Sequence, residues 1–457
     1  MAQVEEKIRQ DYTEGPILTS IMKMGLPSMF GFLIHQIYGI VDTYWVSNLS
    51  EGESAVAGIT FFNSIMWLFF SFNQLVGPGS VAVISRRYGE KNYDLVEKAI
   101  KESILLKLFF GLLLGVSGFF FAEKMLMLMG AEGDAILLGV AYGRIMFLAM
   151  PVLYATYTIF TAMRGVANPN MALVLMLVSN VLNMLLDPVF IFGYLGMPAL
   201  GIRGAAYASV LSYVLTFTAG MLLFYRDRTN VKLNLKGKAA VEIVSMWKMV
   251  KIGIPAWLGE LSFSGSRLII VPMIATFGTS VVAAYGIGTQ VTSLGVMILV
   301  GIGLGLSSLI GHNLGSGKKE RAKKTADQAI WLGVSIMAVY ALVTILFARV
   351  IMGIFFDNAE TIAHGVTLLR LFAIGFPFIG AYIMLEEIHL GVGLNTPAMV
   401  ITVIHSWGFQ VLPIVLATEV FGFGEISVWC VFGAAIAVSA VIFYLYYRRG
   451  KWLTIKL

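Results

Sequence analysis

Charged side chains are scarce in this sequence. Of its 457 residues only 13% are charged, whereas 58% are hydrophobic. Soluble domains carry about 25% charged residues, so this set could not cover a soluble globule of the same length. The mean hydropathy is +0.83, and apolar runs long enough to cross a bilayer recur along the whole chain. The excess apolar surface is therefore expected to face lipid.

The sequence has a single cysteine and contains neither a signal-peptide pattern nor a nucleotide-binding loop. The single cysteine, Cys430, excludes an internal disulfide. Residues 1–16 are polar and lack the basic-then-apolar order of a signal peptide, so we expect a cytoplasmic N-terminal lead. No Gly-x-x-x-x-Gly-Lys-Ser/Thr loop occurs, and the histidines lack zinc-site spacing. We therefore expect neither an ATP-driven protein nor an enzyme, and no cofactor.

The chain instead contains a series of apolar segments with the length of membrane-spanning helices. The expected fold class is an all-α polytopic membrane protein with twelve transmembrane helices. Their expected bounds are 17–46, 55–84, 97–121, 135–163, 170–194, 201–225, 242–275, 281–309, 326–347, 361–389, 397–418 and 426–447.

Basic residues are concentrated in alternate connections. Clusters follow the second, sixth, eighth and twelfth expected spans, at 86–101, 226–238, 318–324 and 448–456. Lys and Arg accumulate on the cytoplasmic side of membrane proteins. Both termini are therefore expected in the cytoplasm, in a multi-pass protein of the plasma (inner) membrane. Because the net charge of +6 is spread over these loops, it does not indicate nucleic-acid binding. The odd-numbered connections carry few basic residues, namely Lys124, Arg203 and Arg349.

Short motifs recur between the two halves at a nearly constant spacing. Lys23–Pro27 returns as Lys251–Pro255, and Ala55–Ile59 returns as Ala283–Ile287, both 228 residues later. Each half has six spans, so the repeat is parallel, with a pseudo-twofold axis along the membrane normal. Two glycines, Gly89 and Gly165, return 226 residues later as Gly315 and Gly391.

The repeat divides the chain into two lobes with a substrate cavity expected between them, a design that permits alternating access. We expect the protein to work as a monomer. The expected parts are a cytoplasmic lead (1–16), an N-lobe with spans one to six (17–225), a cytoplasmic linker (226–241), a C-lobe with spans seven to twelve (242–447) and a cytoplasmic tail (448–457).

Ionisable groups inside spans are costly and mark functional sites. In the first span, His35, Tyr38, Asp42 and Trp45 share one helical face, and Gln36 lies beside it. This polar stripe makes Asp42 a candidate ion or proton site and places His35, Gln36 and Tyr38 in the substrate cavity or the coupling path. The alternative is an interfacial Asp42 at the outer end of its helix.

The fifth span offers a second acid. Asn183 and Asp187 are one turn apart, and Pro188 leaves the carbonyl of Met184 without its helical partner. A carboxylate, an amide oxygen and a free carbonyl are ligands that hard cations such as Na⁺ prefer, while a carboxylate alone can carry a proton. The alternative is a proline kink that Asp187 merely caps.

The second half carries its own acids at different places. Glu260 is a candidate for the substrate cavity or for coupling. Glu386, Glu387 and His389 are expected near the cytoplasmic end of the tenth span, in an interfacial role. The repeat equivalent of Asp42 is Ile270, so the paired acids of the first half are not duplicated.

Several of these stretches resemble the MATE (multidrug and toxic compound extrusion) family, over essentially the whole chain. They are Gly25–Thr43, Arg164-Gly165 with Asn168-Pro169, Asn183–Pro188 and Gly201–Ser209. The span-five motif together with the span-one acid is closer to the DinF-like and archaeal branch than to the NorM-like branch.

The resemblance implies export of small organic cations in exchange for inward H⁺ or Na⁺. It implies a first-lobe cation or proton site formed by Asp42, Asn183 and Asp187, a Na⁺ site if Na⁺ is the coupling ion. Ser209 would supply the hydroxyl that the family usually takes from a threonine, although its loop is longer here. Pro27 matches a family proline associated with bending of the first helix.

Two other function classes remain open at this stage. A flippase for lipid-linked oligosaccharides would share the two-lobe design, but it would need a basic cavity to hold a pyrophosphate, and the first-lobe site is acidic. An intramembrane enzyme would need a nucleophile–base pair or a metal constellation, which the sequence does not suggest. A secondary efflux antiporter of cationic substrates within membrane lipid is the favoured interpretation.

Overall fold

The computed structural model describes residues 10–234 and 241–455. The expected lead, linker and tail therefore lie partly outside the described residues, at 1–9, 235–240 and 456–457. All regular secondary structure in the described part is helical, as the expected fold class requires.

Twelve helical segments of the described chain are long and apolar enough to cross a membrane, which confirms the predicted number of spans. Most extend a few residues beyond the predicted bounds. The second and eleventh spans each consist of several consecutive helical pieces.

The N-lobe contains α1 (Ile17–Ser47), α2 (Gly52–Ser71), η1 (Phe72–Leu75), α3 (Gly77–Gly89), α4 (Tyr93–Leu128), α5 (Asp134–Gly165), α6 (Pro169–Phe192), η2 (Tyr194–Gly196) and α7 (Ile202–Tyr225). The C-lobe contains α8 (Ile243–Ala275), α9 (Thr279–Gly315), α10 (Lys319–Phe355), α11 (Ala359–Val392), α12 (Thr396–Val403), η3 (Ile404–Val411), α13 (Leu412–Val415), η4 (Leu416–Val420) and α14 (Glu425–Arg448), followed by η5 (Lys451–Thr454).

Capping residues fix several helix ends. The side chain of Asn92 accepts a hydrogen bond from the amide of Leu95 at the start of α4, and Asn358 does the same at the start of α11. Such caps satisfy N–H groups that have no partner within the helix. At the other end, α6 and α11 stop at glycines in the left-handed conformation, Gly193 (φ 77°) and Gly393 (φ 80°).

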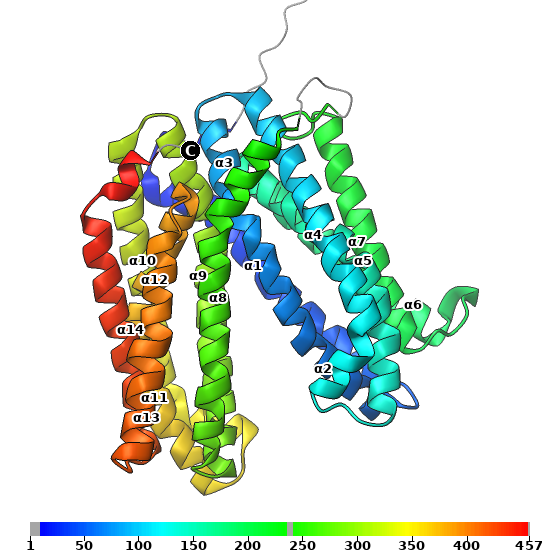
Figure 1. The fold of residues 1–457 in the computed structure, drawn as a ribbon, viewed down its shortest axis with the longest axis vertical. Coiled ribbons are helices and arrows are strands. Elements are labelled where there is room, and N and C mark those ends of the chain that lie inside the picture. Colours follow the sequence, from blue (N-terminus) through cyan, green and yellow to red (C-terminus); the bar gives the residue numbers. More distant parts are fainter. Residues whose placement is uncertain (1–9, 235–240, 456–457) are drawn as a thin grey trace, which may run out of the picture.

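The two lobes converge at one end and diverge at the other (Figure 1). The described N-terminal residues and the C-terminus both lie at the converging end, which we call the closed end. There the backbones touch through glycines. A methyl group on Gly89 would lie 2.3 Å from the carbonyl oxygen of His312, and one on Gly315 would lie 2.1 Å from that of Arg86. Any larger side chain at these glycines would keep the lobes apart.

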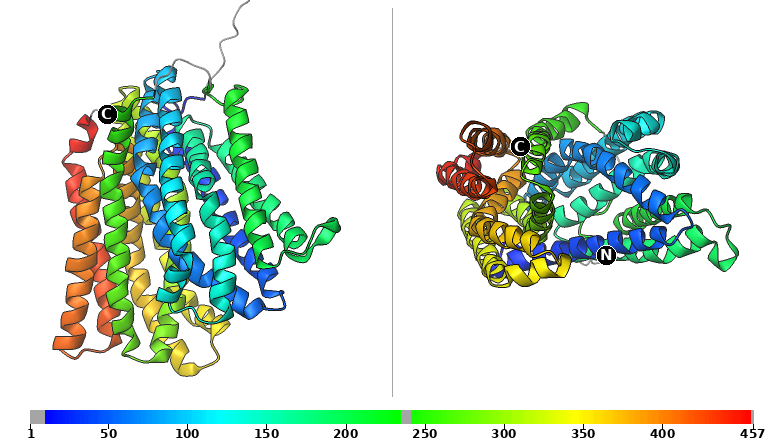
Figure 2. Two further views of the ribbon diagram at one scale, coloured as in Figure 1. Left: turned by 45° about the vertical axis from the view of Figure 1, so that its right-hand side comes forward. Right: turned by 90° about the horizontal axis from the view of Figure 1, so that it is seen from below.

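Helix α1 belongs to both lobes. Near its start, Gly25 packs against the backbone of Ile302 on α9, in the C-lobe. Further along, Gly31 packs against Met176 on α6, in the N-lobe. Figure 2 shows α1 passing from the C-lobe helices to α6. The helix that carries Asp42 therefore connects the closed end to the interior of the N-lobe.

The connection between the lobes is anchored on α4. Asn234 donates its amide to Glu97 (2.8 Å) and accepts from Lys101 (2.6 Å). At the start of α8, the fully buried Glu102 accepts from the amide of Glu242 (2.9 Å) and from the hydroxyl of Ser245 (2.6 Å). These bonds explain why a membrane-spanning helix carries charged residues near its end.

Candidate functional site

The predicted first-lobe residues form one buried cluster. Asp42 comes from α1, Asn183 and Asp187 come from α6, and Ser209 comes from α7. Their exposed fractions are 8%, 3%, 0% and 2%. Asp42 is therefore buried within the bundle and does not lie at an interface. Pro188 does not end α6, which continues to Phe192, so Asp187 lies within a continuous helix.

Asn183 holds the cluster together. With its amide oriented so that both atoms are paired, its nitrogen donates to the Asp187 carboxylate at 3.0 Å. Its oxygen then accepts from the hydroxyl of Ser209 at 3.1 Å and from the Ser209 amide at 3.0 Å. Ser209 also contacts the hydroxyl of Tyr38 at 3.4 Å. The longer loop before α7 has therefore not displaced Ser209 from the acids.

The carboxyl groups of Asp42 and Asp187 lie close enough to influence each other electrostatically. An ionised carboxylate can only accept hydrogen bonds, so the two groups could bond directly only if one of them carried a proton. The Oδ1 atoms of both acids are buried without a donor from any described residue. Buried acceptors without partners are rare. This geometry suits a proton or a cation held between the two groups.

Two tyrosines that the sequence reasoning missed surround the acids. Tyr142 on α5 lies near Ser209 and both acids, and Tyr213 on α7 lies near Asp42. Together with Tyr38 they bring three phenol groups to the site. No spacing in the sequence points to them, because they come from helices whose orientation only the packing determines.

The remaining first-span candidates occupy different surroundings. His35 contacts the side chain of Asn180 at 3.4 Å and borders a small cavity within the N-lobe. Gln36 is exposed and lies outside the acid cluster. Pro27 is buried, and α1 runs through it unbroken, next to the residues that pack on α9. The polar stripe of the first span is therefore only partly directed at the acids.

The C-lobe has a separate acidic pair. Glu260 on α8 is half-buried, and Glu386 on α11 is exposed, yet the two carboxylates are close enough to interact electrostatically. Neither belongs to the first-lobe cluster. Arg267, on the same helix as Glu260, donates instead to the hydroxyl of Tyr285 at 2.5 Å.

The interfacial expectation for Glu387 and His389 is wrong. Their exposed fractions are 7% and 0%. Glu387 packs against Gly303 of α9 and interacts electrostatically with the buried Arg164 of the N-lobe. The Nδ1 atom of His389 lies 2.7 Å from the carbonyl oxygen of Leu385. Both residues face the interior because α11 is covered by α9, α10 and α14.

The chain matches a sequence model of the MatE family at two places, residues 27–189 and 255–416. This chain belongs to the MATE family. The two matches begin 228 residues apart, at Pro27 and Pro255, which is the spacing of the internal repeat.

Curated relatives agree with this assignment. A probable multidrug resistance protein, YoeA of Bacillus subtilis, is 29% identical over 87% of this chain and 86% of its own length. The multidrug export protein MepA of Staphylococcus aureus (strain MRSA252) is 25% identical, covering 96% of both chains. The MATE family and these relatives are transporters, so the expectation that the chain is not an enzyme is confirmed.

Solved structures share the fold. A MATE transporter in its bent conformation superimposes with a TM-score of 0.88 at 22% identity, covering 96% of both chains. An outward-facing MATE transporter of the MOP superfamily gives 0.86 at 22% identity. A MOP superfamily transporter from Pyrococcus furiosus, described as having a binding pocket of reversed polarity, also gives 0.86. The chain is therefore a multi-pass MATE transporter with the two-lobe fold.

Proposed function

We propose that this MATE transporter is a secondary active antiporter, which exports small organic cations in exchange for inward H⁺ or Na⁺. The observation that carries the proposal is the buried pair Asp42 and Asp187, whose Oδ1 atoms lack donors from the described residues. Asn183 and Ser209 complete the coupling site through the bonds described above. The multidrug names of YoeA and MepA support the substrate class.

The coupling follows from the cost of buried charge. Two ionised carboxylates in contact, away from water, repel each other strongly. A proton or Na⁺ bound between Asp42 and Asp187 removes that repulsion and lets the N-lobe close around the site. Release of the ion restores negative charge, which attracts a cationic substrate to the same lobe. Ion and substrate thus favour different states, as antiport requires.

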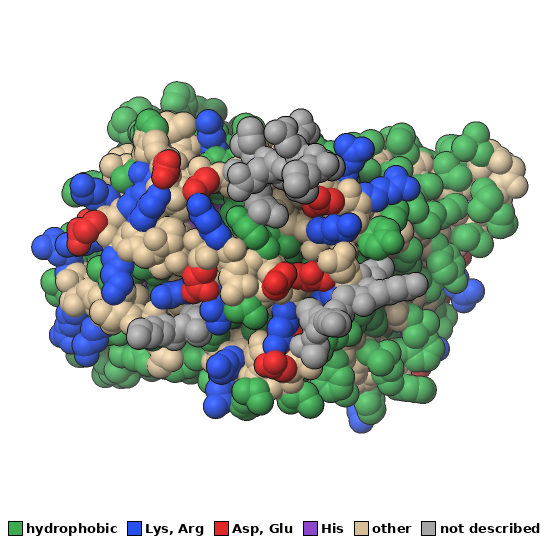
Figure 3. Space-filling model, turned by 90° about the horizontal axis from the view of Figure 1, so that it is seen from above, with side chains coloured by type: hydrophobic (Ala, Val, Ile, Leu, Met, Phe, Trp, Pro, Cys, Tyr) green, Lys and Arg blue, Asp and Glu red, His purple; other side chains and the backbone are tan. Residues whose placement is uncertain are grey.

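The conformation of the structure, with the lobes apart at one end, suits entry of the coupling ion from outside the cell. The basic loops support a cytoplasmic location for both termini, and Figure 3 shows Lys and Arg side chains spread over the closed end. The lobes thus meet on the cytoplasmic side of the plasma membrane and diverge on the outer side. We expect the protein to act as a monomer in this membrane, because its two lobes form the cavity within one chain.

Groups near the cluster would shape the substrate cavity. We expect Tyr38 and His35 to contribute from the N-lobe and Glu260 of α8 from the C-lobe, with Pro27 where α1 passes from one lobe to the other. The chain has 24 Met and 31 Phe residues, whose adaptable side chains suit binding of varied substrates. We expect Gln36 to contribute less than the others, since it lies outside the cluster.

The proposal is tested with purified protein in liposomes. A cationic dye is loaded, and its efflux is measured under an imposed pH or Na⁺ gradient. The Asp42→Asn and Asp187→Asn variants should each lose gradient-driven efflux while keeping the melting temperature of the wild type. Asp134→Asn, an exposed acid at the start of α5, is the matched control and should transport normally.

The outcome also separates the function classes. Full efflux in both cluster variants would remove the coupling role of the acids. If no cation gradient drives any dye but a lipid-linked sugar crosses the bilayer, the protein is a flippase. Comparison of the pH and Na⁺ gradients identifies the coupling ion.

A further inference from the structure

The segment before α1 crosses the closed end without regular secondary structure. We call residues 10–16 the N-terminal strap. Its first residue contacts the N-lobe, where the hydroxyl of Tyr88 on α3 donates to the carbonyl of Gln10 at 2.9 Å. The Tyr88 ring in turn lies 5.0 Å from the ring of His312 on α9. The strap therefore begins directly over the junction between the lobes.

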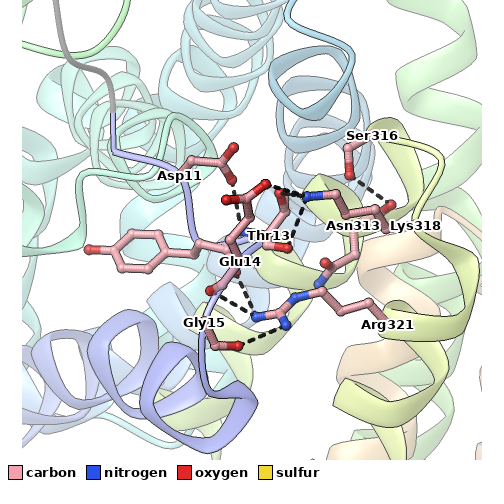
Figure 4. Close-up of polar contacts among 9 residues, drawn as sticks. Asp11, Thr13, Glu14, Gly15, Asn313, Ser316, Lys318 and Arg321 are labelled. Carbon is pink, nitrogen blue, oxygen red and sulfur yellow. Dashed lines mark hydrogen bonds and ion pairs between the residues drawn. The ribbon is translucent and has the colours of Figure 1, made fainter.

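The rest of the strap is held by two basic residues of the C-lobe (Figure 4). Lys318 Nζ donates to the hydroxyl of Thr13 (2.9 Å), to its carbonyl (3.2 Å) and to the carboxylate of Glu14 (3.2 Å). Arg321 donates to the carbonyls of Gly15 (2.9 Å), Glu14 (3.0 Å) and Tyr12 (3.4 Å).

Lys318 and Arg321 lie where a positive charge is unfavourable unless acceptor groups compensate for it. Lys318 caps the N-terminus of α10, and Arg321 lies in its first turn. A helix N-terminus carries partial positive charge and disfavours cations. The strap oxygens compensate for both, since they offer one carboxylate, one hydroxyl and four carbonyls.

The internal repeat explains why the closed end is crowded with positive charge. The segments around Gly89 and Gly315 are repeat equivalents, and each carries more basic than acidic residues, at 86–91 and 318–324. Closure brings these loops together, because the backbones of Gly315 and Arg86 touch. Lys91 of one loop and Lys318 of the other both interact favourably with Asp11 of the strap. The strap thus places acidic groups between two equivalent basic loops.

We propose that the N-terminal strap is an electrostatic latch, which lets the closed end of the transporter close by neutralising the two repeat-related basic loops. Lys318 and Arg321 are positioning residues that keep the strap in place, and they touch neither ion nor substrate. The proposal rests on the proposed function, because only alternating access requires this end to open. Opening separates Tyr88 and Lys91 from α10, so the strap must lose its contacts with one lobe.

The test measures opening directly, without transport. Nitroxide labels are placed at Arg226 and Arg449, one exposed residue in each lobe near the closed end, in a Cys430→Ser background, and double electron–electron resonance is recorded in nanodiscs. The Asp11→Asn plus Glu14→Gln variant removes the strap charges and keeps its acceptor oxygens. Each exposed ion pair changes an equilibrium by up to about fivefold, so the open fraction should rise about threefold to tenfold.

Two control variants carry the same charge changes elsewhere on the same face. Asp94→Asn plus Glu320→Gln removes two exposed acids in the first turns of α4 and α10. We call Lys318 and Arg321 the clamp. The clamp variant, Lys318→Gln plus Arg321→Gln, releases the strap and is compared with Lys323→Gln plus Lys324→Gln, which removes two exposed bases further along α10. Only the strap and clamp variants should open the closed end.

A double-mutant cycle that combines the strap and clamp variants distinguishes a latch from independent effects of the two sets of residues on the closed state. If the strap acids act through the clamp, the combined variant should open less than the product of the two separate effects. Equal distance distributions in strap and control variants, or effects that multiply, overturn the latch. The label distances need no substrate, so a wild type that transports no dye refutes the proposed function and leaves this test valid.

Discussion

The glycine contacts at the closed end lead to a quantitative prediction. In Gly315→Ala, the new methyl group would lie 2.1 Å from the carbonyl oxygen of Arg86 and 3.0 Å from the amide nitrogen of Glu90, both in the other lobe. Ordinary carbon–oxygen contacts are about 3.3 Å or longer, so the lobes must separate by roughly 1 Å. Overpacking of this kind costs about 1–3 kcal/mol. Because 1.4 kcal/mol is a factor of ten, the closed state should lose about fivefold to 150-fold in population.

The matched control is Gly286→Ala in the same helix, α9, where a methyl group meets nothing within 4 Å. Alanine there should only raise helix stability, by up to about 1 kcal/mol. Resonance distances between labels at Arg226 and Arg449 should lengthen in Gly315→Ala and stay unchanged in Gly286→Ala. Identical distances in both variants would refute the claim that backbone contact at the glycines defines the closed end.

Three further predictions use other parts of the chain. Ser209→Ala should weaken gradient-driven efflux, because it removes the hydroxyl that Asn183 binds. Ser212 is equally buried on α7 and its hydroxyl has no partner among the described residues, so Ser212→Ala should not weaken efflux. Equal losses of liposome efflux in the two variants would exclude Ser209 from the site. Lys107→Ala should destabilise the protein by about 1–3 kcal/mol, since it removes the charged donor that Lys107 offers to the Asn73 carbonyl at 2.7 Å and leaves only the longer bond from the Val76 amide at 3.4 Å. The exposed Lys124→Ala is the control in thermal unfolding, and equal unfolding temperatures in the two variants would contradict the role of that bond. Burial raises the pKa of Asp11, but the amide and hydroxyl of Thr13 together with Lys318 and Lys91 lower it more, so the net pKa is lowered from 3.8. A lowered pKa stabilises the bound strap above the unfolded value, and this contribution is lost as the pH falls through the folded value. In an Asp42→Asn plus Asp187→Asn background, where the acid pair cannot titrate, label distances at the closed end should stay constant from pH 8 to about 5 and lengthen only below 3.8; opening near pH 6 in that background would contradict this assignment.

The fold was predictable because each membrane span is identified by the composition of a short stretch of sequence. The length of the apolar segments and the alternation of charge between loops predicted twelve spans, and the internal repeat predicted two lobes. The acid cluster was partly predictable, because Asp42 and Asp187 stand out in apolar surroundings. Tyr142 and Tyr213 did not stand out, because tyrosine is common in membrane helices and only helix rotation directs these side chains to the acids.

Residues at the closed end were the hardest to predict. Glu387 and His389 lie near a helix end in the sequence, which suggested an interface, yet neighbouring helices of the C-lobe bury them. The strap bonds likewise depend on contacts between residues about 300 positions apart, such as Thr13 and Lys318. Local patterns carry no information on such contacts, since they arise only when two separately folded lobes meet.

The central claim, that coupling ion and substrate compete for the charge of one buried acid pair, is tested most directly by ion release. A cationic dye is added to the purified protein, and released protons or Na⁺ are counted with an indicator. The account predicts release of the bound ion on dye binding in the wild type, and none in Asp42→Asn or Asp187→Asn. Dye binding of equal affinity at every pH and Na⁺ concentration, without ion release, would contradict it.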